Sequence, residues 1–142
     1  MRELNRVILH CSATREGQDV TAKTIKRWHT SPPRNWSDIG YHYVIRLDGT
    51  IEKGRPIHRP GAHTKGHNAE SVGVCYIGGV EQDGKTPKDT LTLAQEQAFR
   101  SLYNALQVVF GPMTLHGHRE YAAKACPSFN VKDKFPDLCK IG

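Results

Sequence analysis

Apolar residues gather in five short runs along the chain, and runs of this length and composition are typical of β-strands. The expected strands are Arg6–Cys11, Tyr41–Arg46, Thr50–Lys53, Ser71–Ile77 and Met113–Leu115. The tripeptide Leu47-Asp48-Gly49 lies between the second and third strands, and an Asp-Gly pair at such a place favours a tight reversal. The pattern therefore predicts a hairpin here.

Two longer segments, Thr21–Thr30 and Thr92–Phe110, have apolar residues at helical spacing. Thr92 and Gln95 form a capping-box pattern at the start of the second segment, and Gly111-Pro112 ends it. The apolar face expected for this helix is Ala98, Phe99, Leu102, Ala105, Leu106 and Val109. A short helical turn is expected at Val131–Phe135. With no repeat or linker in view, the pattern predicts one α/β domain over residues 1–142, a central mixed β-sheet flanked by helices.

Composition fits this prediction. The chain of 142 residues is 37% hydrophobic and 24% charged, which is ordinary for a globular domain with a single core. No run approaches the roughly 20 apolar residues that cross a bilayer. The amino-terminal apolar run is also shorter than the roughly 7–15 residues of a signal-peptide core. We therefore expect a monomer that is made in the cytoplasm and depends on another factor for any route outward.

The net charge of +6 predicts association with an anionic polymer, such as teichoic acid, lipopolysaccharide or the carboxylates of peptidoglycan. The basic residues are scattered, and no arginine-rich block or RNA-reading aromatic motif accompanies them, which argues against a specific nucleic-acid module. Without a signal peptide the cysteines are expected to be reduced. Cys75 lies in an apolar run and should be core, whereas Cys139 has no assignable role.

Candidate chemistry comes from His10, His118 and Cys126, because two imidazoles and a thiolate are good zinc ligands and catalytic zinc commonly has three protein ligands. His10 and His118 each end an apolar segment, and Cys126 follows in a loop, so tertiary folding would have to bring them together. His116 lies two residues before His118 and would face the same side of a strand. On the residues alone, either histidine could be the second ligand.

Four segments resemble a known family when taken in order: HCSAT, DIGYHYVIRLDGTIEKGR, GAHTKGHNAESVGVCYIGG and AAKACPSF. They are similar to the type 2 N-acetylmuramoyl-L-alanine amidases, which include the amidase-type lysozymes of T-odd bacteriophages and are related to the peptidoglycan recognition proteins of animals. The resemblance runs from about Arg6 to Phe135. It implies the fold of that family and a zinc-dependent peptidoglycan hydrolase. The implied bond is the amide between the lactyl group of N-acetylmuramic acid and L-alanine, and the implied role is an endolysin released with a holin.

The resemblance also implies roles for individual residues. One zinc per chain is implied at His10, His118 and Cys126, which selects His118 over His116. The implied catalytic residues are Tyr41 and Lys124, and the implied substrate-binding residues are His63 and Asn68. Recycling amidases of the same superfamily typically have Asp at the position of Cys126. The thiol therefore indicates the lytic phage branch.

Two other functions fit some of these residues. A cysteine amidase or peptidase would use Cys11 as nucleophile and His118 as base, but a reactive thiolate usually lies at a helix N-terminus or in an electropositive niche, whereas Cys11 lies at the end of a strand. Cys11 should also face the opposite side of its strand from His10. A non-catalytic peptidoglycan-binding module is the second alternative, but such modules typically lack the Cys ligand. A copper electron carrier ranks last, because neither Met1 nor Met113 is placed as an axial ligand just after Cys126.

Overall fold

The computed structural model describes residues 2–139, so the expected domain of residues 1–142 is described except at its two ends. Its strands are β1 Arg6–Cys11, β2 Thr14–Arg15, β3 Tyr43–Ile45, β4 Ile51–Lys53, β5 Ser71–Tyr76, β6 Gly79–Val80 and β7 Thr114–Gly117. Its helices are α1 Ala22–Thr30, α2 Leu93–Phe110 and α3 Val131–Lys134, with a 3₁₀ turn, η1, at His118–Glu120. Within the described residues, no helix is long and apolar enough to cross a membrane.

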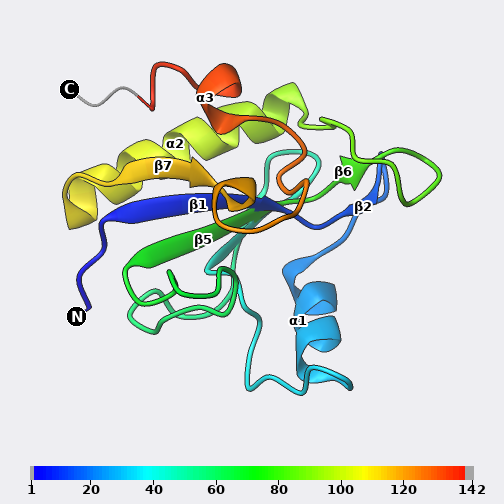
Figure 1. The fold of residues 1–142 in the computed structure, drawn as a ribbon, viewed down its shortest axis with the longest axis horizontal. Helices are drawn as coiled ribbons and strands as arrows, with labels where there is room; N and C mark the ends of the chain where they lie inside the picture. Colours follow the sequence, from blue (N-terminus) through cyan, green and yellow to red (C-terminus); the bar gives the residue numbers. More distant parts are fainter. Residues whose placement is uncertain (1, 140–142) are drawn as a thin grey trace.

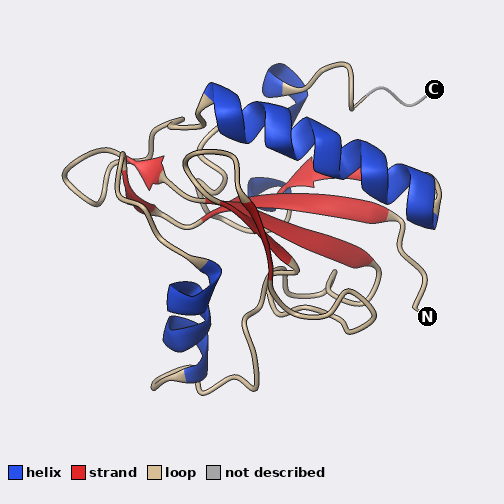
Figure 2. Cartoon of the chain, turned by 180° about the vertical axis from the view of Figure 1, so that it is seen from behind, coloured by secondary structure: helices blue, strands red, loops and turns tan. Residues whose placement is uncertain are grey.

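Five strands form one mixed sheet in the order β4-β3-β5-β1-β7, and β2 and β6 form a separate two-stranded pair. The three pairings from β3 to β7 are parallel, whereas β3 and β4 form the expected antiparallel hairpin. Gly49 turns this hairpin at a φ of 90°, a conformation that glycine adopts without strain. α2 runs along one side of the sheet and α1 lies on the other (Figures 1 and 2). The expected fold class, a mixed sheet flanked by helices, is confirmed.

Each face of the sheet has its own apolar cluster. Val7, Leu9 and Cys11 alternate along β1 and pack with α2. The opposite face packs toward α1 and includes Val44 of β3 and Cys75 of β5. The expected core position of Cys75 is confirmed, since its side chain is fully buried. His10 lies between Leu9 and Cys11 and therefore faces the α1 side of the sheet.

The helix α2 differs from its expected apolar face. Its buried residues are Gln95, Phe99, Leu102, Tyr103 and Leu106. Ala105 and Val109 are exposed, the latter at 69%, so the face that meets the sheet is rotated toward Tyr103. The capping box is confirmed, because the Thr92 hydroxyl accepts from the Gln95 N–H and the Gln95 side chain accepts from the Thr92 N–H.

Several strand ends also differ from expectation. The expected strand Tyr41–Arg46 is β3 only over Tyr43–Ile45. Before it, the backbone of Tyr41 and His42 bonds instead to Arg55 and Gly54, at the end of the β4 hairpin. The expected strand Met113–Leu115 is shifted toward the carboxyl end, as Thr114–Gly117. This shift places His118 directly after the strand.

Candidate metal centre

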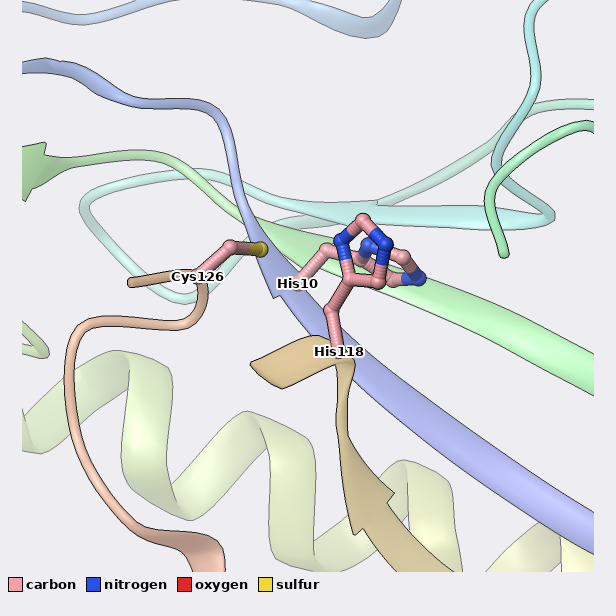
Figure 3. Close-up of side chains that lie close together, drawn as sticks. All are labelled: His10, His118 and Cys126. Atoms are coloured by element: carbon pink, nitrogen blue, oxygen red, sulfur yellow. The ribbon is translucent and has the colours of Figure 1, made fainter. Parts of the chain in front are cut away.

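The carboxyl ends of β1 and β7 meet at one edge of the sheet, because the two strands are parallel neighbours. His10 lies near the end of β1, and His118 follows β7 directly. The loop after η1 brings Cys126 to the same place, where its thiol accepts a hydrogen bond from the Cys11 backbone N–H at 3.2 Å. The ligand atoms of His10, His118 and Cys126 lie within 4.8 Å of one another. Figure 3 shows these three side chains gathered together.

Both His10 and His118 are held in the neutral form. Burial is the largest effect that lowers the pKa of His10 well below its usual value, and the positive charge of Lys124 acts in the same direction. Burial and Lys124 also lower the pKa of His118. Both imidazoles therefore keep a free lone pair near neutral pH, as a metal ligand requires.

Cys126 needs a cation to become a thiolate. Its contact with the Cys11 thiol, together with burial, raises the pKa of the Cys126 thiol above its usual range. A metal ion opposes this effect because it favours the deprotonated ligand. The N–H of Cys11 is already directed at the sulfur. Two neutral imidazoles and one thiol with a directed donor form a set that fits zinc.

His116 is engaged elsewhere. One of its ring nitrogens lies 2.9 Å from Glu120 Oε1 and the other 2.7 Å from Thr114 Oγ1. Among the described residues, the converging set of potential ligands contains His118 and not His116. The geometry thus agrees with the choice that the family resemblance implies.

A cleft of about 450 Å³ opens beside His118. Its walls are Trp36, Ala62, His63, Thr64, Lys65, Asn68, His118, Tyr121, Ala122 and Lys124. The side chain of Lys124 is exposed, so its ammonium group is available to a molecule in the cleft. One expected metal ligand, His118, thus shares this cleft with His63 and Asn68, the two residues expected to bind substrate.

The Tyr41 ring packs beside the His10 ring, and their centroids are 5.1 Å apart. Burial raises the pKa of the Tyr41 phenol well above its usual value, so its hydroxyl stays protonated and able to donate a hydrogen bond. His42, the next residue, is buried and accepts a hydrogen bond from the Gly73 N–H at 3.0 Å. The structural role expected for His42 agrees with this contact.

His63 and Asn68 have internal partners as well as a place on the cleft wall. His63 is 9% exposed, and its Nδ1 lies 2.8 Å from His10 Nε2. The Asn68 side-chain oxygen accepts the backbone N–H groups of His63 and Thr64, both at 3.0 Å. Asn68 therefore closes this loop, and a direct contact of either residue with substrate stays a prediction.

Two parts of the site were not recognised in the sequence. The aromatic rings of Trp36 and Tyr121 line the cleft. The hydroxyl groups of Thr64 and Ser71 surround His63. Trp36 could have been noticed, because it is a lone aromatic residue in a polar loop. Ser71 could not, because a serine at the start of an apolar strand has no feature that indicates a functional site.

Cys11 is placed poorly for a nucleophile. The contact with Cys126 lowers the pKa of the Cys11 thiol to about 7 despite its burial. However, Cys11 is only 6% exposed and belongs to the apolar cluster on the α2 side of the sheet, the face opposite to His10. Its thiol lies 3.9 Å from the Ser128 hydroxyl. Cys139, to which the sequence assigned no role, packs against the same cluster.

Comparison with known proteins shows the family to which the chain belongs. The family model described as N-acetylmuramoyl-L-alanine amidase matches residues 1–129. The chain therefore belongs to the N-acetylmuramoyl-L-alanine amidase family. Within it, the chain is similar to endolysins of phages: it is 44% identical to the endolysin of Klebsiella phage KP32, over 92% of this chain and 85% of that protein. It is 43% identical to the endolysin of Escherichia phage T7, over 89% of this chain and 82% of that protein.

Solved structures show the same fold. An endolysin N-acetylmuramoyl-L-alanine amidase from Clostridium intestinale superposes with a TM-score of 0.79 at 28% identity, covering 95% of this chain and 85% of that chain. Wild-type Drosophila PGRP-LB superposes with a TM-score of 0.78 at 25% identity, covering 100% of this chain and 86% of that chain. The fold is therefore shared by phage-type and animal members of the superfamily.

Proposed function

We propose that this protein is a zinc-dependent endolysin that hydrolyses peptidoglycan at the amide between the lactyl group of N-acetylmuramic acid and L-alanine of the stem peptide. The observation that carries the proposal is the convergence of His10, His118 and Cys126 beside an open cleft. Membership of the amidase family and the similarity to phage endolysins support the substrate and the reaction.

Two neutral imidazoles and the Cys126 sulfur would hold the metal. Zinc in such a site supplies Lewis-acid activation of water and of the scissile carbonyl. The Cys11 N–H would hold the sulfur as a thiolate through its 3.2 Å hydrogen bond. The ligands come from two strand ends and a loop that are tied to one another, which fixes the geometry before substrate arrives.

Lys124 and Tyr41 would act on the substrate. The exposed ammonium group of Lys124 lies on the cleft wall, where it would stabilise negative charge that develops on the carbonyl oxygen during attack. The protonated phenol of Tyr41 would orient the attacking water or donate a hydrogen bond to the same oxygen. His63 and Asn68 would border the bound glycan or peptide.

The similarity to phage endolysins supports a proposal for the cellular setting. We propose that the protein acts as a monomer on the bacterial wall after release from the cytoplasm, with the passage supplied by a holin. The surplus of positive charge would favour contact with anionic envelope polymers.

The decisive experiment combines metal content with product analysis. We expect about one zinc per purified chain, and loss of wall lysis in His10→Ala, His118→Ala and Cys126→Ala. Mass spectrometry of digested peptidoglycan should show intact glycan chains and stem peptides with a free L-alanine amine. New reducing sugar ends would reject the amidase assignment, and full activity after exhaustive chelation would reject the metal.

The same assay separates the cysteine-nucleophile alternative. Cys11→Ser should keep lysis, because Cys11 faces the α2 side of the sheet, away from His10. A Cys11 enzyme would instead lose activity in this variant and resist chelators.

A further inference from the structure

His10 contacts a buried group of polar side chains: His63 and Thr64 from the loop before β5, and Ser71, the first residue of β5. His63 Nδ1 is 2.8 Å from His10 Nε2, and His63 Nε2 is 3.2 Å from the Ser71 hydroxyl. His10 is 1% exposed, His63 9% and Ser71 0%. The two imidazole planes are nearly perpendicular, at 89°. Because water is largely excluded, each polar atom here must find its partner within the set.

The direction of these hydrogen bonds can be read from Ser71. Its hydroxyl has one hydrogen, and that hydrogen is directed at the His67 carbonyl oxygen, 2.6 Å away. The Ser71 oxygen can therefore only accept from His63 Nε2, which must carry a hydrogen. A neutral imidazole has a single N–H, so His63 Nδ1 is an acceptor. His63 is only 9% exposed, and among the described residues its ring nitrogens contact hydroxyl groups and His10 but no carboxylate, so nothing there would stabilise a charged ring and the imidazole stays neutral.

The tautomer of His10 follows from that of His63. With an acceptor at His63 Nδ1, His10 Nε2 must be the donor across their 2.8 Å contact. The Thr64 hydroxyl oxygen lies 3.3 Å from His10 Nε2 and 2.9 Å from His63 Nδ1, so it can also accept from the Nε2 hydrogen of His10, which agrees with the same direction. The lone pair of His10 is then on Nδ1. Figure 3 shows one ring nitrogen of His10 on the side away from Cys126 and the other on the side of the site.

We infer that His63 is a positioning residue which, directed by Ser71, holds His10 in the tautomer that leaves Nδ1 free to bind the metal. The inference rests on the zinc chemistry proposed above and gives His63 a role other than substrate contact. Partners of this kind, which hold the second nitrogen of a metal-bound histidine, typically change metal affinity by about 10- to 100-fold when removed.

The surrounding backbone is shaped for this role. A Cβ atom on Gly73 would lie 2.5 Å from the His63 ring, so glycine makes room for the imidazole on β5. The Asn68 side chain holds the backbone of His63 and Thr64 at the start of the loop. The His63 ring is therefore held in place by Gly73 of β5 on one side and by the loop that Asn68 closes on the other.

The first test reads the tautomers directly. Long-range ¹H–¹⁵N correlation spectra of the zinc-free protein should show His10 and His63 both protonated on Nε2, and Ser71→Ala should release His63 from a single tautomer. This measurement needs neither zinc nor activity. A hydrogen on Nδ1 of His10 in the zinc-free wild type would overturn the inference.

The second test measures the zinc dissociation constant by competition with a chelator. His63→Leu removes the acceptor and should weaken zinc binding by about 10- to 100-fold. His63→Asn keeps an oxygen near the position of Nδ1 and should stay within about threefold of wild type. His58→Asn, an exposed histidine in the preceding loop, is the matched control and should not change the constant.

The outcomes separate this inference from the proposed function. A wild-type protein that binds no zinc would reject the proposed function, while the tautomer spectrum would still decide the direction of the hydrogen bonds. Equal zinc affinity in wild type and folded His63→Leu would overturn the positioning role. If His63→Leu does not fold, Ser71→Ala replaces it: its zinc binding should weaken relative to wild type, and unchanged affinity would overturn the inference.

Discussion

Lys124 lies exposed on the cleft wall, two positions before Cys126, and its charge lowers the pKa of both His10 and His118. A positive charge this close to the site should stabilise the transition state without binding the metal. We predict that Lys124→Ala lowers kcat by about 100- to 1000-fold, the typical loss of one oxyanion donor, and leaves zinc content unchanged.

Steady-state kinetics on a soluble muropeptide, with zinc measured in each preparation, test this prediction. Lys65→Ala is the matched control, because Lys65 is a second exposed lysine on the same cleft. Near-normal turnover in Lys124→Ala would make the lysine a bystander, and loss of zinc would make its role structural.

Tyr41 should matter less than Lys124. Its phenol is protonated and adjacent to His10, so removal of the hydroxyl takes away one neutral hydrogen bond and leaves the metal ligands in place. We predict that Tyr41→Phe lowers kcat by about tenfold or less, equivalent to at most about 1.4 kcal/mol. Tyr43→Phe, on the adjacent strand β3, is the control. A loss as large as that of Lys124→Ala would contradict this ranking.

The convergence of His10, His118 and Cys126 could be predicted from residue type, strand ends and family resemblance. The contact between His63 and His10 could not, because it depends on how the loop before β5 folds beneath β1. The sequence shows that His63 and Asn68 belong to an informative loop. It does not show that the Asn68 oxygen closes this loop from within.

At the scale of elements, Gln95 links α2 to the sheet. Its side chain is fully buried, accepts from the Thr92 N–H, and donates to the Ile45 and Ile77 carbonyl oxygens at 3.3 and 3.0 Å. We predict that Gln95→Met lowers the free energy of unfolding by about 1–3 kcal/mol, because buried backbone groups lose their partners. Gln97→Met, on the exposed side of α2, should change it little. Urea unfolding of both variants measures the difference, and equal stabilities would contradict the role given to Gln95.

The long periodic elements could be predicted, whereas the two-residue strands could not. α2 shows helical spacing over 18 residues and β1 is a clear apolar run, but β2 and β6 are too short for any pattern to appear. The upstream end of β3 was predicted wrongly because Tyr41 and His42 have strand-like sequence, whereas their carbonyl oxygens accept from Arg55 and Gly54, which lie beyond β4. The rotation of α2 depends on which side chains the sheet covers, which a helical pattern alone does not specify.

At the scale of the whole molecule, the metal should stabilise the fold, because its ligands converge only in the folded chain. Zinc at 100 times its dissociation constant should add about 2.7 kcal/mol to the free energy of unfolding. We predict that chelation lowers the thermal midpoint and that added zinc restores it. Cys126→Ala should show no response to zinc, and an equal response in that variant would place the stabilising metal elsewhere.

Stability should also depend on pH through two buried histidines outside the metal centre. Burial lowers the pKa of His29 and of His42 to about 4, below the usual value of 6.5. Between these values the unfolded chain binds more protons than the folded one, so stability is full above pH 6.5 and falls as the pH decreases toward 4.

Urea unfolding measured between pH 4 and pH 6.5 tests whether the free energy of unfolding falls on acidification. His29 Nδ1 accepts the Gly40 N–H at 2.9 Å, and asparagine can keep this acceptor without titrating. His29→Asn should therefore lose less stability on acidification than wild type, whereas exposed His58→Asn should behave as wild type. A stability that rises as the pH falls from 6.5 to 4 would contradict the assignment.

The placing of β1 between β5 and β7 has a consequence for the order of events during synthesis. A chain grows from its amino end, so β1 is made long before either neighbour that pairs with it. His118 and Cys126 come later still, after β7. Until the chain has passed β7, the nascent protein contains His10 but neither His118 nor Cys126, so the sheet is incomplete and the proposed metal site cannot form. Hydrolytic capacity would arise only after Cys126 has been made and has folded back onto the first strand.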